Sequence, residues 1–293
     1  MRTADVAAGL DEFFRMDDFP PDDFAEIEAF CEEAGIPLAD YATPAFMRRH
    51  NGLMVTAYET QLVYTVVFPS DELIAEIERL AYQRPTLIFT HHPMDFETSG
   101  RGLVPISSES LERMKNAGIS LYSAHAPLDC HPEVSTSRAL ARAIGVPVDG
   151  TFAEYYGGHA GVFGEIGETQ LAEFVAAAGL ACGVERVDSK RYSGTARRVA
   201  VCAGGAALPE LMQEAVDLGC DTYVTGDYRV RHGGPWAEEH RPRFDGFLEA
   251  VPLNLVGASH FATEAIVLKT DVIELFAEMG LEAQFVGQDD PWR

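Results

Sequence analysis

Residues 62–92 read LVYTVVFPSDELIAEIERLAYQRPTLIFTHH, and this stretch decides the fold class. An apolar segment at 62–68 is followed by Ser70, a residue type that commonly caps the first turn of a helix. Apolar residues then recur with helical spacing, and a second apolar segment at 86–90 leads directly into two histidines. The pattern predicts a strand, a helix and a second strand that ends at a pair of imidazoles.

The same alternation recurs along the chain. Strands that alternate with helices and are apolar on both faces indicate parallel sheets covered by helices, so the predicted fold class is α/β. The length of 293 residues also allows two lobes. Further strands are expected at 53–57, 119–123, 198–203, 221–225 and 253–258, and further helices at 108–117, 207–218 and 260–279.

The chain is strongly acidic, with 22 Lys and Arg against 46 Asp and Glu and a formal net charge of −24. Binding to nucleic acid or to anionic membranes depends on clustered Lys and Arg. The charge therefore argues against a general nucleic-acid-binding protein and against a membrane-surface protein. Residues 1–40 hold twelve acids and two bases, and we expect this stretch to be solvated surface because it precedes the first motif.

Targeting and redox features are those of an intracellular protein. Residues 1–14 carry acids where a secretory signal needs positive charge, and the longest apolar segments are far shorter than the ~18 residues that span a bilayer. The five cysteines are widely spaced and form no C-x-x-C motif, so we expect mostly buried, reduced thiols. Together these features predict a soluble cytoplasmic protein.

Chemically versatile side chains follow several of the expected strands. In open parallel sheets, ligands bind at the carboxyl ends of the strands, so residues at these positions are candidates for a functional site. The candidates are His91 and His92, His125 and Asp129, Asp227, and His260 and Glu264.

Each candidate also has a purely structural interpretation. Adjacent histidines occur in hydrogen-bonded loops, His125 is compatible with a core histidine bonded to backbone, and Asp129 with a helix cap or a turn. His260 and Glu264 are four residues apart, so they share one side of the expected helix, and that side continues into apolar positions. Buried imidazole and carboxylate groups are costly without partners, so this pair predicts either a salt-bridge network or a set of metal ligands.

Imidazoles and carboxylates without thiolates form a nitrogen and oxygen ligand set, which suits Zn, Fe, Mn, Co or Ni. Two divalent ions bridged by a carboxylate fit this number of ligands. Such a site lowers the pKa of a bound water and favours hydrolysis by a metal-bound hydroxide. His125 and Asp227 are candidates to orient ligands or relay protons behind the metal ligands. The expected substrate is an unidentified small molecule, and no catalytic residue is assigned.

Several motifs occur in the order found in a known family. The chain resembles the NIF-three-like family (NGG-one-interacting-factor-three), whose members are also labelled GTP cyclohydrolase I type-two homologues, over most of residues 51–279. The segments that carry the resemblance are Asn51-Gly52-Leu53, His91-His92-Pro93, His125 to Asp129, Val199-Ala200-Val201-Cys202, Thr225-Gly226-Asp227, and His260 with Glu264.

The resemblance implies a dinuclear metal site in which Glu264 touches both ions. The implied ligands are His91, His92, Asp129, His260 and Glu264.

The resemblance also implies the architecture and the assembly. Two related three-layer α/β/α lobes with the metal site between them are expected, with their C-terminal strands exchanged. Residues 1–126 together with 240–293 would form lobe one, residues 127–239 would form lobe two, and no third domain would be inserted. Members commonly assemble as homo-oligomers, and we expect a homohexamer.

Three functional hypotheses follow. The leading one is a metal-dependent hydrolase, and the alternative is a non-catalytic metal-binding protein of the interaction or chaperone type. A further alternative, GTP cyclohydrolase-type ring opening, depends on the family label alone. The chain departs from the family pattern where Ser259 replaces a glycine and Ala126-Pro127 replaces Thr-Asn, and we assign no role to His232 because the family histidine tends to come one position earlier.

Overall fold

The computed structural model of the chain describes residues 1–22, 26–97, 102–231 and 235–290. Its elements confirm the α/β class. The chain divides into two compact units. Unit 1 contains Met1–Glu97, Leu103–Leu128 and Leu268–Asp289, and unit 2 consists mainly of Asp129–Val267.

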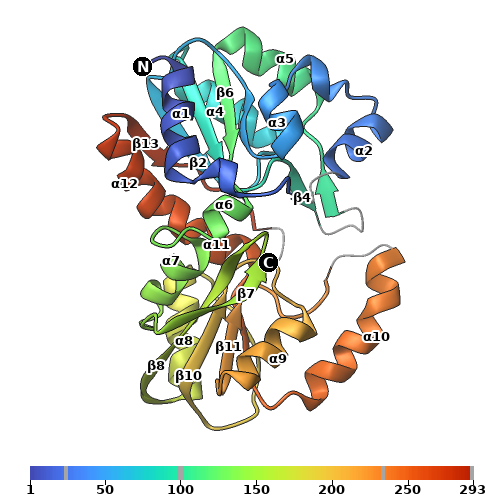
Figure 1. Ribbon diagram of the computed structural model, residues 1–293, viewed down its shortest axis with the longest axis vertical. Coiled ribbons are helices and arrows are strands. Elements are labelled where there is room, and N and C mark those ends of the chain that lie inside the picture. Colours follow the sequence, from blue (N-terminus) through green and yellow to red (C-terminus); the bar gives the residue numbers. More distant parts are fainter. Residues whose placement is uncertain (23–25, 98–101, 232–234, 291–293) are drawn as a thin grey trace. The chain divides into compact units, whose positions relative to one another are not determined.

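The sheet of unit 1 has the strand order β1-β6-β3-β2-β13. The last four of these strands run parallel, whereas β1 is antiparallel to β6. β13 comes from the C-terminal part of the chain and lies beside β2 (Figure 1). Because β3 and β6 are parallel neighbours, their carboxyl ends meet at one edge of the sheet. The strands are β1 (Gly52–Val55), β2 (Leu62–Val66), β3 (Thr86–Thr90), β6 (Ile119–Ser123) and β13 (Glu282–Phe285).

Helices cover both faces of this sheet. On one face, α4 (Asp71–Ala81) and α5 (Ser108–Ala117) bury apolar side chains against Ile88 and Leu121. On the other face, the ring of Phe89 contacts Phe14 next to α1 and Phe276 on α12. The expected cap of α4 is confirmed, since the Ser70 hydroxyl accepts a hydrogen bond from the N–H of Leu73. The other helices are α1 (Thr3–Phe13), α2 (Glu26–Glu33), α3 (Pro44–Arg49), α6 (Ala126–Asp129) and α12 (Asp271–Glu278), with 3-10 turns at Met16–Asp18 and Leu38–Asp40.

The N-terminal segment belongs to the core of unit 1. Val6, Leu10 and Phe14 are buried, and the Phe14 ring stacks on Phe89 of β3. The buried Tyr122 hydroxyl donates a hydrogen bond of 2.7 Å to the Asp11 carboxylate. Apolar burial and this hydrogen bond therefore hold the segment against the sheet.

Among the described acids of residues 1–40, Asp22 departs from the expected solvated surface. Glu12, Asp17 and Asp18 are exposed, as expected, but Asp22 is buried with a relative exposure of 3%. Its Oδ2 atom forms hydrogen bonds with His125, Asn51 and a backbone amide, and these partners satisfy the buried carboxylate.

The sheet of unit 2 has the order β7-β8-β10-β11-β12-β9. The central strands β10, β11 and β12 are parallel, whereas β7, β8 and β9 are antiparallel to their neighbours. The sheets are therefore mixed, although the sequence pattern indicated parallel sheets throughout. The strands are β7 (Gly150–Tyr155), β8 (Gly158–Gln170), β9 (Asp188–Lys190), β10 (Thr195–Cys202), β11 (Thr222–Thr225) and β12 (Asn254–Gly257).

β7 and β8 form a hairpin in a glycine-rich segment that reads as loop in the sequence. A Cβ atom at Gly150 would clash with the ring of Phe163, and one at Gly161 would clash with the ring of Phe152. Because these glycines have no side chain, the aromatic ring of the paired strand has space to lie over them. The strands therefore continue through the glycine positions.

Four helices pack on the sheet of unit 2. α9 (Pro209–Asp217) and α10 (Pro235–Ala250) contribute Met212 and Leu248 to a core with Tyr223 and Leu255. α7 (Thr136–Ala143) and α8 (Leu171–Cys182) contact β8 and β10 (Figure 1).

One expectation near the C-terminus needs correction. The helix expected at 260–279 is two helices, α11 (His260–Lys269) and α12, because the backbone at Thr270 leaves helical geometry with φ −124° and ψ −91°. Residues 240–267 belong to unit 2, in which β12 pairs with β11 and β9.

The remaining features are minor. β4 (Asp95–Glu97) and β5 (Gly102–Val104) form a separate two-stranded sheet. All five cysteines are free thiols, of which Cys130 is partly exposed and the others are buried. Within the described residues, no helix has both the length and the apolar character that a membrane crossing requires.

Candidate metal centre

Two of the candidate histidines lie where β3 ends. His91 and His92 follow Thr90, and their backbone N–H groups still donate to the carbonyls of Val66 and Val67, so the chain is held in register beyond the strand. Both imidazoles are buried, with relative exposures of 0% and 5%. The end of the strand therefore fixes two imidazoles in the interior of unit 1.

The orientation of each ring has an identifiable cause. Nδ1 of His91 lies 2.9 Å from the carbonyl oxygen of Ala124, which can only accept, so Nδ1 carries the proton and Nε2 faces away from that bond. The His92 ring stacks on Phe68 with centroids 4.3 Å apart and an interplanar angle of 17°. The Ala124 carbonyl and the Phe68 ring thus fix the orientations of the two imidazoles.

His125 joins these two histidines from the end of β6. Its backbone N–H donates to Oδ1 of Asn51 at 2.8 Å, and its ring centroid lies 4.9 Å from the rings of both His91 and His92. One ring nitrogen from each of the three histidines lies within 4.8 Å of the other two. This spacing allows three imidazoles to bind one metal ion.

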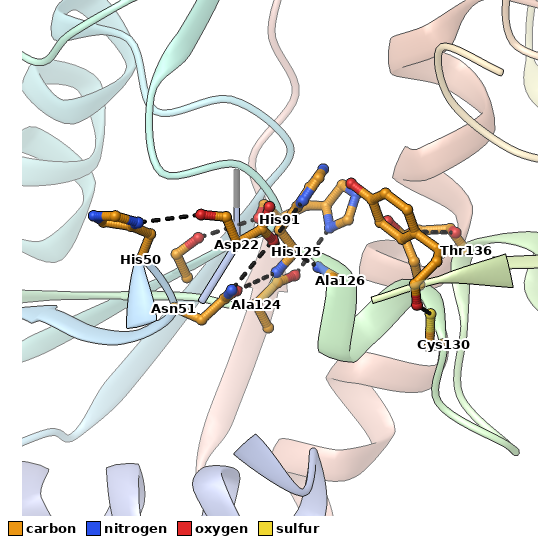
Figure 2. Close-up of polar contacts among 12 residues, drawn as sticks. Asp22, His50, Asn51, His91, Ala124, His125, Ala126, Cys130 and Thr136 are labelled. Carbon is orange, nitrogen blue, oxygen red and sulfur yellow. Dashed lines mark hydrogen bonds and ion pairs between the residues drawn. The ribbon is translucent and has the colours of Figure 1, made fainter. Parts of the chain in front are cut away.

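Asp22 contacts this histidine group and was missed in the sequence. Its Oδ2 atom lies 2.9 Å from Nδ1 of His125 and accepts from the Asn51 amide and the Ala126 N–H (Figure 2). Burial alone would raise the pKa of Asp22, but the charge and hydrogen bond of His125, with the other two donors, hold that pKa well below its usual range. An ionised carboxylate therefore lies behind His125.

In unit 2, His260 and Glu264 lie one turn apart on α11. Nε2 of His260 is 2.9 Å from Oε1 of Glu264, and the side chains are only 13% and 5% exposed. The expectation that this pair points into the protein is confirmed. The pair is one imidazole and one carboxylate aimed at each other, which is a usable pair of ligand groups.

The loops after β10 and β11 make room for this pair. A Cβ atom at Gly204, which has φ +78°, would overlap the Glu264 carboxylate, and one at Gly226 would lie 2.5 Å from Cα of His260. The Thr263 hydroxyl accepts from the N–H of Gly204 at 3.0 Å and so joins α11 to the first loop. The glycines are therefore required by close approach as well as by the turn.

Asp129 is the third candidate ligand in unit 2. Its Oδ1 accepts a hydrogen bond of 2.6 Å from the hydroxyl of Thr136 at the start of α7. Burial raises the pKa of the Cys202 thiol to about 12, and the negative charges of Asp129 and Glu264 both add to this shift. The two carboxylates therefore act on the same buried thiol at the end of β10.

Asp227 has a different environment. Its Oδ2 pairs with Nε of Arg231 at 2.9 Å, and its Oδ1 accepts from the N–H of Arg229. Arg231 also pairs with Asp188. Asp227 is therefore part of an ion-pair network, whereas His232 lies outside the described residues.

The candidate ligands have the donor atoms that a divalent metal ion requires. Unit 1 supplies three imidazoles, and one of them, His91, has the backbone-carbonyl partner that is common behind metal-bound histidines. Unit 2 supplies the largely buried His260 and Glu264 and the partly exposed carboxylate of Asp129. Nitrogen and oxygen donors of this kind suit borderline divalent ions. The fold and its ligand groups thus define an α/β protein with candidate metal-binding groups.

Comparison with known proteins identifies the family. Residues 45–291 match the family described as Duf34/NIF3 (NGG1p interacting factor 3), and the chain belongs to this family. The chain is 28% identical to a protein from Pyrococcus horikoshii over 82% of this chain and 89% of the relative, and 28% identical to one from Deinococcus radiodurans over 80% and 84%. Both relatives carry the name "GTP cyclohydrolase 1 type 2 homolog".

Solved structures share the fold of this chain. The structure of protein ybgI aligns with a TM-score of 0.71 and 22% identity over 99% of this chain and 100% of that chain. Reduced HcgD from Methanocaldococcus jannaschii aligns with a TM-score of 0.68 and 19% identity over 98% of both chains. At these identities the likeness concerns the fold.

Proposed function

We propose that this protein binds two divalent metal ions and uses them to hydrolyse a small-molecule substrate. The observation that carries the proposal is the group of three imidazoles in unit 1, two of them buried and that of His125 partly exposed, with ring nitrogens within 4.8 Å of one another. Three imidazoles this close together form a ligand group that suits a divalent ion.

The proposed ligand set combines imidazoles and carboxylates. In unit 2, Glu264 is the candidate to bridge the ions because a carboxylate has two oxygens, whereas each imidazole can offer one nitrogen. The mixed set suits Zn, Fe, Mn, Co or Ni. Divalent ions in such sites polarise the bond to be cleaved and lower the pKa of water. The proposed ligands are His91, His92, Asp129, His260 and Glu264.

Metal analysis tests the first part of the proposal. Purified protein reconstituted with Zn²⁺, Mn²⁺ or Fe²⁺ is expected to retain about two ions per chain, as the number of ligands suggests. His91→Ala and His260→Ala each remove an imidazole from a different unit, and we expect both variants to retain fewer ions. His159→Ala is the matched control, because His159 is an exposed histidine of β8. Equal retention in all four proteins would contradict the proposed ligands.

Substrate screening tests the second part. The metal-loaded protein is incubated with phosphoesters, cyclic amides and nucleotides, and turnover should disappear in His260→Ala. GTP belongs in the panel because of the name of the relatives, with release of formate as the measurement for ring opening. Metal binding without turnover of any substrate class would favour a non-catalytic metal-binding protein.

Assembly is proposed from the family resemblance and is measured separately. We expect a homo-oligomer, with a hexamer as the specific expectation. Light scattering after size-exclusion chromatography gives the mass directly, and a mass equal to one chain of 32.0 kDa would contradict it.

A further inference from the structure

Asp22 and His125 form a buried pair that the family match does not include in full. Asp22 precedes the matched residues 45–291, and its side chain is 2% exposed. The N-terminal segment thus contributes a carboxylate to the group of histidines at the ends of β3 and β6 (Figure 2).

Hydrogen bonding fixes which nitrogen of His125 carries the proton. Oδ2 of Asp22 already accepts from two N–H donors, the Asn51 amide and the Ala126 backbone. The same oxygen therefore accepts from His125 as well, so Nδ1 carries the proton and, in the neutral imidazole, Nε2 carries the lone pair.

The environment of His125 matches that of His91. Nδ1 of His91 donates to the Ala124 carbonyl, and Nδ1 of His125 donates to the Asp22 carboxylate, both at 2.9 Å. A carbonyl or a carboxylate behind the distal nitrogen is the usual arrangement of metal-binding histidines, because it fixes the tautomer and increases the basicity of the ligating nitrogen.

We propose that His125 is a third imidazole ligand of the metal site in unit 1, and that Asp22 is the residue that positions it. The inference rests on the metal binding proposed above and adds two residues to it. Asn51 supports the arrangement from both sides, because its Oδ1 accepts from the His125 backbone and its Nδ2 donates to Asp22.

A role in docking the N-terminal segment does not account for the pair. That segment is already held by the buried Phe14 ring and by the bond from Tyr122 to Asp11. Asp11 therefore provides a matched control: it is a carboxylate of the same segment whose side-chain partners are Tyr122 and Arg49 instead of a histidine.

Zn²⁺ affinity is measured on the full chain in competition with a chromophoric chelator, for Asp22→Asn, Asp22→Ala, His125→Ala and the control Asp11→Asn. We expect Asp22→Ala to weaken Zn²⁺ binding about 10- to 100-fold, the usual effect of removing a partner of a metal-bound histidine. His125→Ala should weaken it at least as much. Asp22→Asn should lose less Zn²⁺ affinity than Asp22→Ala, because its amide oxygen still accepts from Nδ1 of His125. The control Asp11→Asn should keep the wild-type affinity and melt at a lower temperature.

Histidine ¹⁵N spectra provide a readout that a structural role would not change. In the metal-free wild type, Nδ1 of His125 should be protonated, and Zn²⁺ should shift the Nε2 resonance. Asp22→Asn should keep the fold and the same tautomer, whereas Asp22→Ala should populate both tautomers.

The outcomes separate this inference from the proposed function. Unchanged affinity in Asp22→Ala and His125→Ala, with a loss in His91→Ala, would leave metal binding intact and overturn the inference. A loss in His125→Ala alone would overturn the role of Asp22. Absence of Zn²⁺ binding by the wild type would overturn both proposals.

Discussion

Gly204 packs against Glu264 so closely that a side chain at position 204 would overlap the Glu264 carboxylate. The loop after β10 and the helix α11 are therefore packed so closely that one added carbon atom would clash. Gly205 adds to this fit, because a Cβ there would lie 3.2 Å from the His260 ring. A candidate ligand pair on a helix thus depends on glycines that are far away in the sequence.

Gly204→Ala should displace Glu264 and weaken metal binding. Gly204 has φ +78°, so the alanine also strains the backbone by about 1 kcal/mol or more. Gly219→Ala is the control, because Gly219 has φ +77° and nothing within 4 Å of the added Cβ. Denaturant unfolding should show a similar strain cost in both variants, with a larger loss in Gly204→Ala. Metal affinity should fall in Gly204→Ala alone, and an equal fall in both variants would contradict the steric argument.

Ser259 adopts a left-handed backbone conformation that favours glycine. Its φ is +79°, and its hydroxyl accepts from the N–H of Ala262 in the first turn of α11. Ser259→Gly relieves strain of about 1 kcal/mol and loses only a few tenths of a kcal/mol with the cap, because glycine is itself tolerated at this position, so its stability should equal or slightly exceed that of the wild type. Ser259→Ala keeps the strain and loses the cap, so urea unfolding should show a loss of about 1 kcal/mol. Equal stability of the two variants would show that φ carries no cost here.

Tyr122 makes the stability of unit 1 sensitive to alkaline pH. Burial, followed by the charge and hydrogen bond of Asp11, raises the pKa of Tyr122 well above its usual value. Below about pH 10 both the folded and the unfolded chain keep this proton, and above it only the folded chain does, so stability falls as pH rises. Urea midpoints measured across this range should fall less steeply in Tyr122→Phe. Tyr122→Phe should also lose about 1–2 kcal/mol at neutral pH through the missing hydrogen bond.

The thiols should differ in reactivity. Burial raises the pKa of Cys31 and of Cys220 to about 11 and that of Cys202 to about 12. At about pH 8 these three are almost entirely protonated and unreactive. A chromogenic disulfide reagent should therefore modify the partly exposed Cys130 first in the native protein, and Cys130→Ser should abolish the fast phase. A fast phase that persists in Cys130→Ser would contradict the burial of the other thiols.

Asp227→Asn tests whether this carboxylate serves a metal or an ion pair. Because Asp227 pairs with Arg231, we expect the variant to be less stable than the wild type. We expect its metal content to equal that of the wild type. Arg231→Gln is the companion variant and should behave in the same way. Loss of metal in Asp227→Asn would assign the carboxylate to the metal centre instead.

The parts of the fold with strong local patterns could be predicted from the sequence. The expected segments 86–90, 108–117 and 119–123 coincide with β3, α5 and β6. Apolar segments mark the two strands, and helical periodicity with capping residues marks the helix. The β7–β8 hairpin could not be predicted, because its glycines are explained only by aromatic rings on the paired strand. The local sequence pattern of a strand does not specify which strand it pairs with.

The candidate ligands divide in the same way. His91, His92 and His260 follow recognisable strand ends or helix starts, and the structure buries all three or nearly so. Asp22 has no local signal that distinguishes it from Asp17 or Asp18, because only its contact with a histidine one hundred and three residues later explains its burial. The sequence therefore does not distinguish Asp22 from the exposed acids around it.

The integration of the N-terminal segment into unit 1 limits how the protein can be shortened. The family match begins at residue 45, but the core and the histidine group both depend on residues before it. A fragment trimmed to the match would uncover Phe89, deprive Tyr122 of its acceptor, and remove the carboxylate behind His125. The residues that match the family are thus fewer than those that the core of unit 1 requires.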